Sequence, residues 1–290
     1  MLLGTAQWGW TMNDKSAFEV LDVFYESGFR QIDSATNYPI NKIEADFRQS
    51  EKIITAWTQA HGVKDLKIMM KIGSLNNNRT PECNLSPSFL LMSLEYYRNS
   101  FQENLNTIMI HWDNREDKKD IFESLEALKT VEKEGFEVGI SGIKYPELYA
   151  EVNQTFNLNF YIQIKHNILQ SDYARYVTFH NNARFIAYGI NAGGVKLNPA
   201  LYDKNSVLAA RGGDLSNNND KIKAIEAILA KANENKNRPP ITDFFQVGML
   251  YAVNSGIENI LVAPSNPTQW QTTLDFFNIL QKFDYQDIKF

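Results

Sequence analysis

The sequence predicts an α/β fold, a (β/α)8 TIM barrel that residues 1–290 form as one domain. Three observations lead to this prediction. Short runs rich in β-branched residues alternate with longer amphipathic segments, and there are eight such runs. Their apolar residues are consecutive, as in parallel strands that are covered on both faces. A barrel of this kind commonly fills the length of this chain as a single domain.

The eight apolar runs are the predicted strands. We expect them to be buried on both faces, because their apolar residues do not alternate with polar ones. In chain order they are Leu2–Thr5, Gln31–Asp33, Lys67–Ile72, Thr107–His111, Glu137–Ser141, Phe160–Ile164, Phe185–Tyr188 and Asn259–Val262.

Amphipathic segments between these runs are the predicted helices. Gly28 follows the first of them as a stop signal, and Pro87 and Pro146 stand near helix starts, where proline is tolerated. The predicted helices are Ser16–Glu26, Ser88–Asn99, Asp120–Glu134, Glu147–Phe156, Ile222–Ala232, Ile241–Val253 and Thr268–Leu280.

The segment after the seventh predicted strand departs from this alternation. It covers residues 201–240 and contains Arg211-Gly212-Gly213 and the polar run Asn217–Asp220 before it ends at Pro239 and Pro240. We interpret it as a long loop and helix excursion within the barrel, and not as a linker between domains.

The composition limits the classes of function. The net charge of −5 comes from 29 basic and 34 acidic residues. We therefore expect no nucleic-acid partner, which would need a clustered positive surface. Cys83 is the only cysteine, which excludes an intrachain disulfide and a cysteine-rich metal site and fits reducing surroundings. With no recognisable signal segment and no run of roughly 18 apolar residues, we expect a cytoplasmic protein without a membrane partner.

Ionisable side chains stand at the ends of three consecutive predicted strands. The second strand ends in Asp33, the third carries Lys71 and the fourth ends in His111, while Tyr38 follows five residues after Asp33. Active sites of such barrels lie at the C-terminal ends of the strands. Neighbouring strands are about 5 Å apart, so we expect these four side chains to converge.

These residue types suit the polarisation of a carbonyl group. Lys71 needs a partner in an apolar strand, and Asp33 supplies one. The ammonium group would lower the pKa of Tyr38 from its ordinary value of about 10, so that the phenol can exchange a proton at neutral pH. His111 can donate a hydrogen bond to the same oxygen. One such residue alone would more often be structural, but the combination of four favours a catalytic site.

Around these four residues, and in several later stretches, the sequence resembles that of the aldo-keto reductase family. FRQIDSATNYP resembles its Asp-Thr-Ala-x-x-Tyr signature, IMMKIGS its lysine strand and TIMIHW its Ile-His-Trp strand. The resemblance continues in order through GISG, YIQIKHNILQ, FIAYGINAGG and LVAPSNPTQW, so it covers essentially the whole chain. It implies an NAD(P)H-dependent oxidoreductase that reduces an aldehyde or ketone without a metal, with Tyr38 as general acid assisted by Lys71, Asp33 and His111.

The resemblance also implies the contacts of the nicotinamide. Ser141 and Gln163 match residues that hold its carboxamide, and Tyr188 matches the aromatic residue that stacks on its ring. The first-strand segment beside that ring corresponds to Gly4, Thr5 and Ala6. Trp8 and Trp112 would form walls of the substrate pocket.

The adenosine end of the cofactor site departs most from the family pattern. Ala263 and Gln269 stand where NADPH-preferring members often carry Lys and Arg. Ser265 and Asn266, at the start of the following helix, could still bind a phosphate. The preference between NADP(H) and NAD(H) is therefore open.

Three further departures concern single positions. Pro39 follows Tyr38 where glycine is usual, which alters the loop after the acid. Gly142 replaces the usual asparagine beside Ser141 and removes a carboxamide contact. His166 stands where tyrosine is common and is expected to be structural.

Two other functions remain open. The chain could be a cofactor-binding, redox-sensing subunit with little or no turnover, as some relatives of the family are. A Schiff-base aldolase would use Lys71 as its nucleophile, but the pairing with Asp33 argues against it. We expect a small-molecule carbonyl substrate and a monomer or weak homo-oligomer; the loop sequences do not disclose which substrate.

Overall fold

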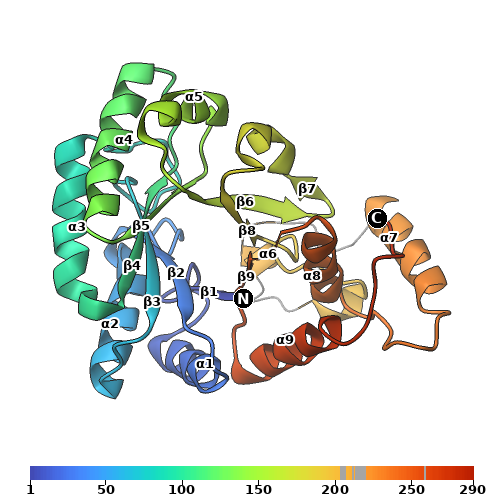
Figure 1. The fold of residues 1–290 in the computed structure, drawn as a ribbon. Coiled ribbons are helices and arrows are strands. Elements are labelled where there is room, and N and C mark those ends of the chain that lie inside the picture. Colours follow the sequence, from blue (N-terminus) through green and yellow to red (C-terminus); the bar gives the residue numbers. More distant parts are fainter. Residues whose placement is uncertain (203–206, 211, 213–219, 258) are drawn as a thin grey trace.

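The computed structural model describes residues 1–202, 207–210, 212, 220–257 and 259–290. At its centre, parallel strands close into a barrel (Figure 1). The strands are β1 (Leu2–Gly4), β2 (Gln31–Ala35), β3 (Lys67–Ile72), β4 (Leu105–His111), β5 (Glu137–Ser141), β6 (Tyr161–Asn167), β7 (Gln170–Ser171), β8 (Arg184–Tyr188) and β9 (Asn259–Val262).

The pairing of the strands confirms the predicted barrel. Neighbours follow the order β5, β4, β3, β2, β1, β9, β8, β6, and a further pairing of β5 with β6 closes the ring. Each of these pairings is parallel. The eight predicted strands are all present. The short β7, which the sequence analysis does not predict, pairs antiparallel with the end of β6.

Helices surround the barrel (Figure 1). Asn13 and Ser86 cap α1 and α3 by accepting hydrogen bonds from backbone N–H groups of the first turn. Pro87 and Pro146 open α3 and α5, as predicted. The helices are α1 (Asp14–Glu26), α2 (Gln49–His61), α3 (Pro87–Phe101), α4 (Lys118–Lys133), α5 (Pro146–Phe156), α6 (Val207–Ala210), α7 (Asp220–Ala232), α8 (Phe244–Asn254) and α9 (Pro267–Leu280).

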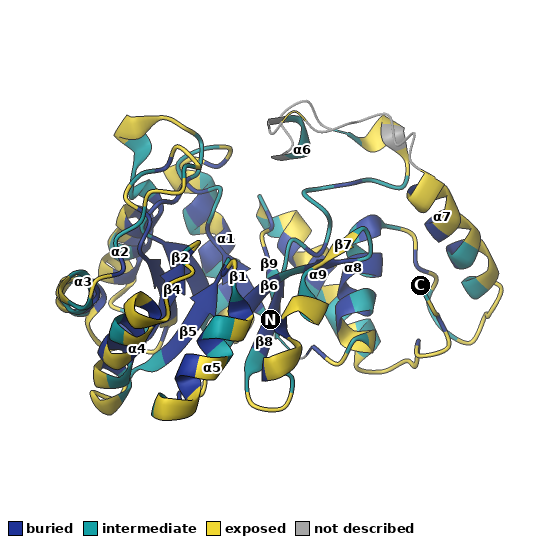
Figure 2. Cartoon of the chain, turned by 90° about the horizontal axis from the view of Figure 1, so that it is seen from above, coloured by how far each residue is buried: buried dark blue, intermediate teal, exposed yellow. Residues whose placement is uncertain are grey.

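The sequence analysis does not predict α2, although it lies between β2 and β3 where a barrel requires a helix. Its buried face carries Ser50, Glu51 and Thr58 beside apolar residues. These polar side chains interrupt the regular spacing of apolar residues by which an amphipathic helix is recognised in a sequence. Within the predicted excursion after β8, the described residues contain α6 and α7, while residues 217–219 of the polar run lie outside the described residues. Helix α7 lies at the periphery of the molecule (Figures 1 and 2).

The core has an outer and an inner part. Figure 2 shows buried strands enclosed by helices whose outer faces are exposed. Between strands and helices lies the larger apolar cluster. Inside the barrel, a small cluster contains Leu2, Met69, Met109 and Ile186. None of the described helices has the length and the apolar composition needed to cross a membrane.

Candidate active site

Inward-facing residues lie beside the inner apolar cluster and beyond it, towards the C-terminal end of the barrel, and we refer to them together as one layer. Successive side chains of a strand point to opposite faces. The residue two positions after each member of the inner cluster therefore also faces inward: Met69 is followed by Lys71, and Met109 by His111. This layer contains Gly4, Asp33, Lys71, His111, Ser141, Gln163 and Tyr188, all of them predicted site residues.

Asp33 and Lys71 form a buried ion pair inside the barrel. Their exposed fractions are 2% and 1%, and the Lys71 Nζ donates to Asp33 Oδ2. Gln163 Nε2 donates to the other carboxylate oxygen and lies 3.2 Å from Met69 Sδ. Burial lowers the pKa of Lys71 from its ordinary value, and the negative charge of Asp33 opposes this shift. The lysine amine is thus held by a carboxylate that is itself fixed from across the barrel.

Tyr38 stands beside this pair. Its ring lies edge-on to that of His111, with centroids 6.1 Å apart and planes at 86°, and Lys71 Nζ is 4.8 Å from the Tyr38 ring centroid. The Tyr38 N–H donates to Ala35 O. The peptide bond to Pro39, the residue that departs from the family pattern, is cis. The structure therefore brings all four predicted catalytic residues together.

His111 is buried at the end of β4 and is held in its neutral form. Burial and the neighbouring charge of Lys71 place the pKa of His111 well below its ordinary value of 6.5. A neutral imidazole carries one donor and one acceptor nitrogen. The His111 Nδ1 has no hydrogen-bond partner within the protein. The Trp112 ring lies 4.7 Å from the His111 ring.

Ser50, at the start of α2, fixes the loop that carries Tyr38. Its N–H donates to Tyr38 O, and its hydroxyl donates to Thr5 at 2.7 Å. Thr5 in turn donates its hydroxyl to Asp33 O at 2.9 Å. Thr5, predicted as a cofactor contact, thus has its hydroxyl engaged in linking β1, β2 and α2. The role of Ser50 could not be predicted from the sequence, because it depends on helix α2, which the sequence does not predict.

A second polar network supports the end of β2 from outside the barrel. Thr36 donates to Lys71 O through its N–H (2.9 Å) and its hydroxyl (3.2 Å). The Thr36 hydroxyl also lies 3.1 Å from Tyr97 Oη, and Tyr97 donates to the buried carboxylate of Glu51 at 2.7 Å. Arg48 completes the network with an ion pair of 2.6 Å to Glu51. These contacts fix β2 relative to β3 at the level of the catalytic residues.

The residues predicted to bind the nicotinamide lie in the same layer. Ser141 and Gln163 are direct register partners on β5 and β6, so a hydroxyl and an amide stand side by side. Tyr188 ends β8 and is half-buried. At Gly4, a Cβ would lie 2.6 Å from Leu261 Cδ2, so β9 leaves no room for a side chain there.

The residues predicted to contact the adenosine end form the N-terminal cap of α9. Asn266 Oδ1 accepts from the Gln269 N–H at 2.9 Å. Gln269 Oε1 accepts from the N–H and the hydroxyl of Ser265 at 2.9 and 2.8 Å. The three side chains thus stabilise the start of the helix, whose free N–H groups carry the positive end of its dipole.

His166 has the structural setting that the sequence analysis expects. Its ring stacks on Tyr251, with centroids 4.7 Å apart, and its nitrogens lie 2.8 and 3.1 Å from the hydroxyls of Ser171 and Ser255. Burial lowers its pKa to about 4. His166 therefore ties the end of β6 to β7 and to the residue that follows α8.

Trp8 and Trp112, the predicted pocket walls, differ in exposure. Trp8 is fully buried, and Trp112 is half-buried. Trp112 packs on Gly142, where a Cβ would lie 2.5 Å from Trp112 Cδ1. The departure at Gly142 is thus coupled to Trp112, since the asparagine usual in the family would collide with the indole.

We predict that Gly142→Ala displaces Trp112. Gly62→Ala is the matched control, because Gly62 has a similar φ (61° against 69°) but open space around it. The control should lose about 1–2 kcal/mol of unfolding free energy from backbone strain. Gly142→Ala should lose about 1–3 kcal/mol more, from overpacking, and should also change KM for a carbonyl substrate. Equal losses and an unchanged KM in denaturant titrations and steady-state assays would contradict this coupling.

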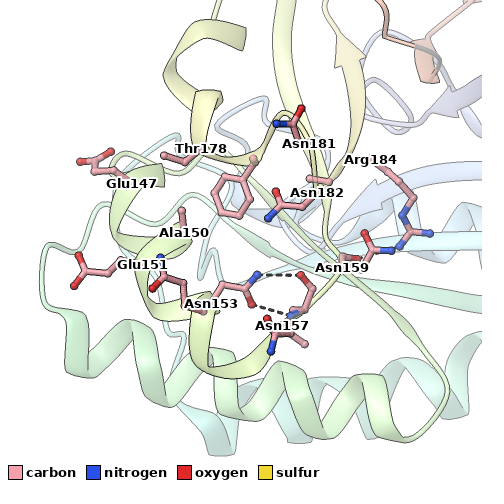
Figure 3. Close-up of a pocket in the computed structure, with 14 residues that line it drawn as sticks. Glu147, Ala150, Glu151, Asn153, Asn157, Asn159, Thr178, Asn181, Asn182 and Arg184 are labelled. Carbon is pink, nitrogen blue, oxygen red and sulfur yellow. Dashed lines mark hydrogen bonds between the residues drawn. The ribbon is translucent and has the colours of Figure 1, made fainter.

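A surface depression lies away from these residues. It has a volume of about 880 Å³ and is lined by the end of α5 and residues 178–184, including Asn153, Asn157 and Arg184 (Figure 3). Arg184 begins β8, so this depression is at the N-terminal end of the barrel. The Asn153 side chain is already bonded to Leu158 through both of its polar groups.

Comparisons with known proteins bear on the family and the fold of the chain. The model of the aldo/keto reductase family matches residues 1–289. The structure is similar to that of the glycerol dehydrogenase AKR11B4 from Gluconobacter oxydans, with a TM-score of 0.69 and 16% sequence identity over 100% of this chain and 94% of that chain. No curated protein matches the chain significantly in sequence.

Proposed function

The chain belongs to the aldo/keto reductase family, and we propose that it reduces an aldehyde or ketone to the alcohol with Tyr38 as the proton donor. Members of this family are NAD(P)-dependent oxidoreductases that act on small carbonyl compounds, and this chain is one of them. The proposal that Tyr38 is the proton donor rests on one observation. A phenol, a lysine–carboxylate pair and a neutral imidazole are grouped at the C-terminal ends of neighbouring strands.

Each of the four residues has a role in this reaction. The Tyr38 hydroxyl gives its proton to the carbonyl oxygen while hydride adds to the carbonyl carbon, so the C=O bond becomes the C–O bond of the alcohol. The positive charge of Lys71 stabilises the phenolate that remains. Asp33 holds Lys71 in place. The neutral His111 ring donates a hydrogen bond to the same oxygen and orients it.

The chain's own residues fit a nicotinamide cofactor at both of its ends. Bound NADPH or NADH would supply the hydride. Because the Gln163 amide nitrogen already donates to Asp33, the groups that suit a carboxamide here are the Ser141 hydroxyl and the Gln163 carbonyl oxygen, on neighbouring register positions. The N-terminus of α9 at Asn266 suits a phosphate group. The residues of the adenosine end indicate no preference between NADPH and NADH. Gln269, which stands where NADPH-preferring members often carry a cation, is neutral and bonded to Ser265.

The proposal is tested by following oxidation of NADPH and of NADH by the purified chain with a panel of aldehydes and ketones. Turnover of at least one carbonyl compound is expected. Tight cofactor binding with negligible turnover, together with a stable complex with another protein, would instead favour the redox-sensing subunit. Trapping of a substrate by borohydride on Lys71 would favour the aldolase. A cytoplasmic location and a monomeric or weakly associated state stay predictions.

A further inference from the structure

The backbone of Trp112, the proposed wall of the substrate pocket, is strained. Its φ of 61° lies in the left-handed region, which is unfavourable for a residue with a large side chain. Such a conformation persists only where the surrounding contacts impose it. Trp112 directly follows His111, and the two rings lie 4.7 Å apart. The contacts that hold Trp112 in this conformation therefore act beside the candidate catalytic residues.

The next residue, Asp113, supplies several of these contacts. It is buried, with an exposed fraction of 1%. Its carboxylate accepts from the Arg115 N–H at 2.9 Å, and the Arg115 guanidinium donates to both carboxylate oxygens at 2.9 and 2.8 Å. The hydroxyl of Tyr149 on α5 donates to Asp113 Oδ2 at 2.5 Å. Four hydrogen bonds thus hold this carboxylate in one orientation.

Backbone contacts on both sides of Trp112 join the loop after β4 to the loop after β5. The Trp112 N–H donates to Ser141 O at 2.9 Å, and the Lys144 N–H donates to Asp113 O at 2.9 Å. Gly142, on which the Trp112 indole packs, lies between these two partners in the sequence. A shift of Asp113 would therefore change how the indole sits on Gly142.

Arg115 extends these contacts to the loop after β3. Its Nη2 also donates to the buried hydroxyl of Ser124 on α4 at 2.9 Å, and that hydroxyl donates to Leu85 O at 2.7 Å. The Leu85 side chain packs at the end of β3, since a Cβ at Gly73 would lie 2.6 Å from Leu85 Cδ2. The loops after β3, β4 and β5 thus meet at the ion pair of Asp113 and Arg115.

This ion pair gives orientation more than it gives stability. Burial of a carboxylate costs free energy, and pairing with a guanidinium largely offsets that cost without a large net gain. Apolar side chains of similar size often serve a fold as well as such a pair. They do not fix a direction, whereas the two parallel N–H donors of Arg115 set the plane of the Asp113 carboxylate.

We propose that Asp113 is a positioning residue that holds the Trp112 indole in place at the wall of the substrate pocket. The inference rests on the proposed carbonyl reduction for its effect on turnover, and it adds a residue that acts through Trp112 and not on the substrate. A pocket wall contacts the substrate in the ground state and in the transition state alike. Its displacement therefore raises KM and leaves kcat unchanged.

The position of the indole can be followed by fluorine NMR of the whole chain labelled with fluorotryptophan. The chain has five tryptophans, and the signal that is missing from Trp112→Ala is that of Trp112. In Asp113→Asn the Trp112 signal should shift or broaden. The neutral amide no longer pairs with Arg115, and it offers one acceptor oxygen where the carboxylate offers two.

Asn104→Ala is the control for a loss of stability alone. It removes another buried polar side chain, whose amide bonds to Val63 O and to the Leu66 N–H at 2.8 and 3.0 Å. These contacts lie just before β3 and β4, at the opposite end of the barrel. The Trp112 signal should keep its wild-type position. The same change in this control as in Asp113→Asn would assign the effect to lost stability and overturn the role of Asp113.

Reduction of para-nitrobenzaldehyde, whose ring can pack on an indole, is the second readout. In Asp113→Asn, KM should rise by about tenfold, the scale of one aromatic contact, while kcat stays within about twofold. In a Trp112→Ala background, Asp113→Asn should cause no further rise, because a residue that acts through Trp112 then has nothing to position. An equal rise in KM with and without the indole would overturn the proposal and leave carbonyl reduction standing.

Tyr149→Phe keeps the test open if Asp113→Asn does not fold. It removes one donor to the Asp113 carboxylate and keeps the aromatic ring, so the Trp112 signal should change in the same sense by a smaller amount. A Trp112 signal that is unchanged in the folded variants would overturn the proposal. Because the NMR readout needs no turnover, a chain that reduces no carbonyl compound would overturn the proposed function, and the signal would still decide whether Asp113 positions Trp112.

Discussion

In the Tyr38→Phe variant, kcat/KM for carbonyl reduction should fall by about 10²–10⁴-fold, the range of a positioned general acid. Phenylalanine keeps the ring that lies edge-on to His111 and removes only the hydroxyl. The dissociation constant of the cofactor should therefore stay within about twofold of the wild-type value, since no cofactor contact is assigned to Tyr38. Steady-state kinetics and a fluorescence titration of NADPH or NADH measure the two quantities.

Tyr25→Phe is the matched control for this variant. It also removes one tyrosine hydroxyl, but from a contact with Asp65 that involves none of the candidate site residues. Its kcat/KM should stay at the wild-type value. Unchanged turnover in Tyr38→Phe would remove Tyr38 from the role of acid. A parallel loss of cofactor affinity would indicate that the Tyr38 hydroxyl also supports cofactor binding.

Replacing Lys71 with methionine should reduce both stability and activity. The change leaves the carboxylate of Asp33 buried without its cation, and breaking one side of a buried pair costs about 3–5 kcal/mol of unfolding free energy. It also removes the charge that stabilises the Tyr38 phenolate, so kcat should fall at every pH tested. Lys67→Met, at the exposed start of the same strand, should change neither quantity. Denaturant titration and steady-state kinetics at several pH values measure both.

The double variant Asp33→Asn with Lys71→Met separates the two effects. It removes the uncompensated charge, so much of the lost stability should return. Activity should not return, because the charge beside Tyr38 is still missing. Recovery of turnover together with stability would mean that the pair serves the fold alone.

Much of the site could be predicted from the sequence because strand periodicity is local. The period of two that separates Met69 from Lys71 and Met109 from His111 also directs the two polar residues into the barrel, towards its C-terminal end. Asp33 ends the second predicted strand and faces the barrel interior as the register partner of Met69. Once the barrel fold is predicted, no further information is needed to predict that these side chains lie together at its C-terminal end.

The contacts that cross the barrel could not be predicted in this way. Gln163 bonds to Asp33 over a separation of 130 residues, and no local pattern encodes which inward side chains meet. Likewise, the close fit of Trp112 on Gly142 depends on positive φ angles at both positions. Because the buried face of α2 carries polar residues, the sequence does not predict this helix. The role of Ser50, which lies on α2 and supports the Tyr38 loop, could therefore not be predicted either.

The cofactor contacts show the limit of residue matching. The sequence predicts that Ser265 and Asn266 bind a phosphate and that Gln269 lies at the adenosine end of the cofactor, yet the polar atoms of these three residues bond to one another as a helix cap. The same cap leaves backbone N–H groups at the helix start, so both descriptions hold for one segment. The sequence alone identifies the start of the helix. It does not show which polar atoms there cap the helix and which bind a ligand.

A crystal structure of the chain with its nicotinamide cofactor and an unreactive carbonyl analogue tests the central claim most directly. The account predicts that the analogue's oxygen lies about 2.6–3.2 Å from both the Tyr38 hydroxyl and a ring nitrogen of His111. The nicotinamide should lie beside Ser141 and Gln163. An analogue oxygen bound out of reach of both Tyr38 and His111, in crystals that reduce a reactive carbonyl compound when it is soaked in instead, would contradict it.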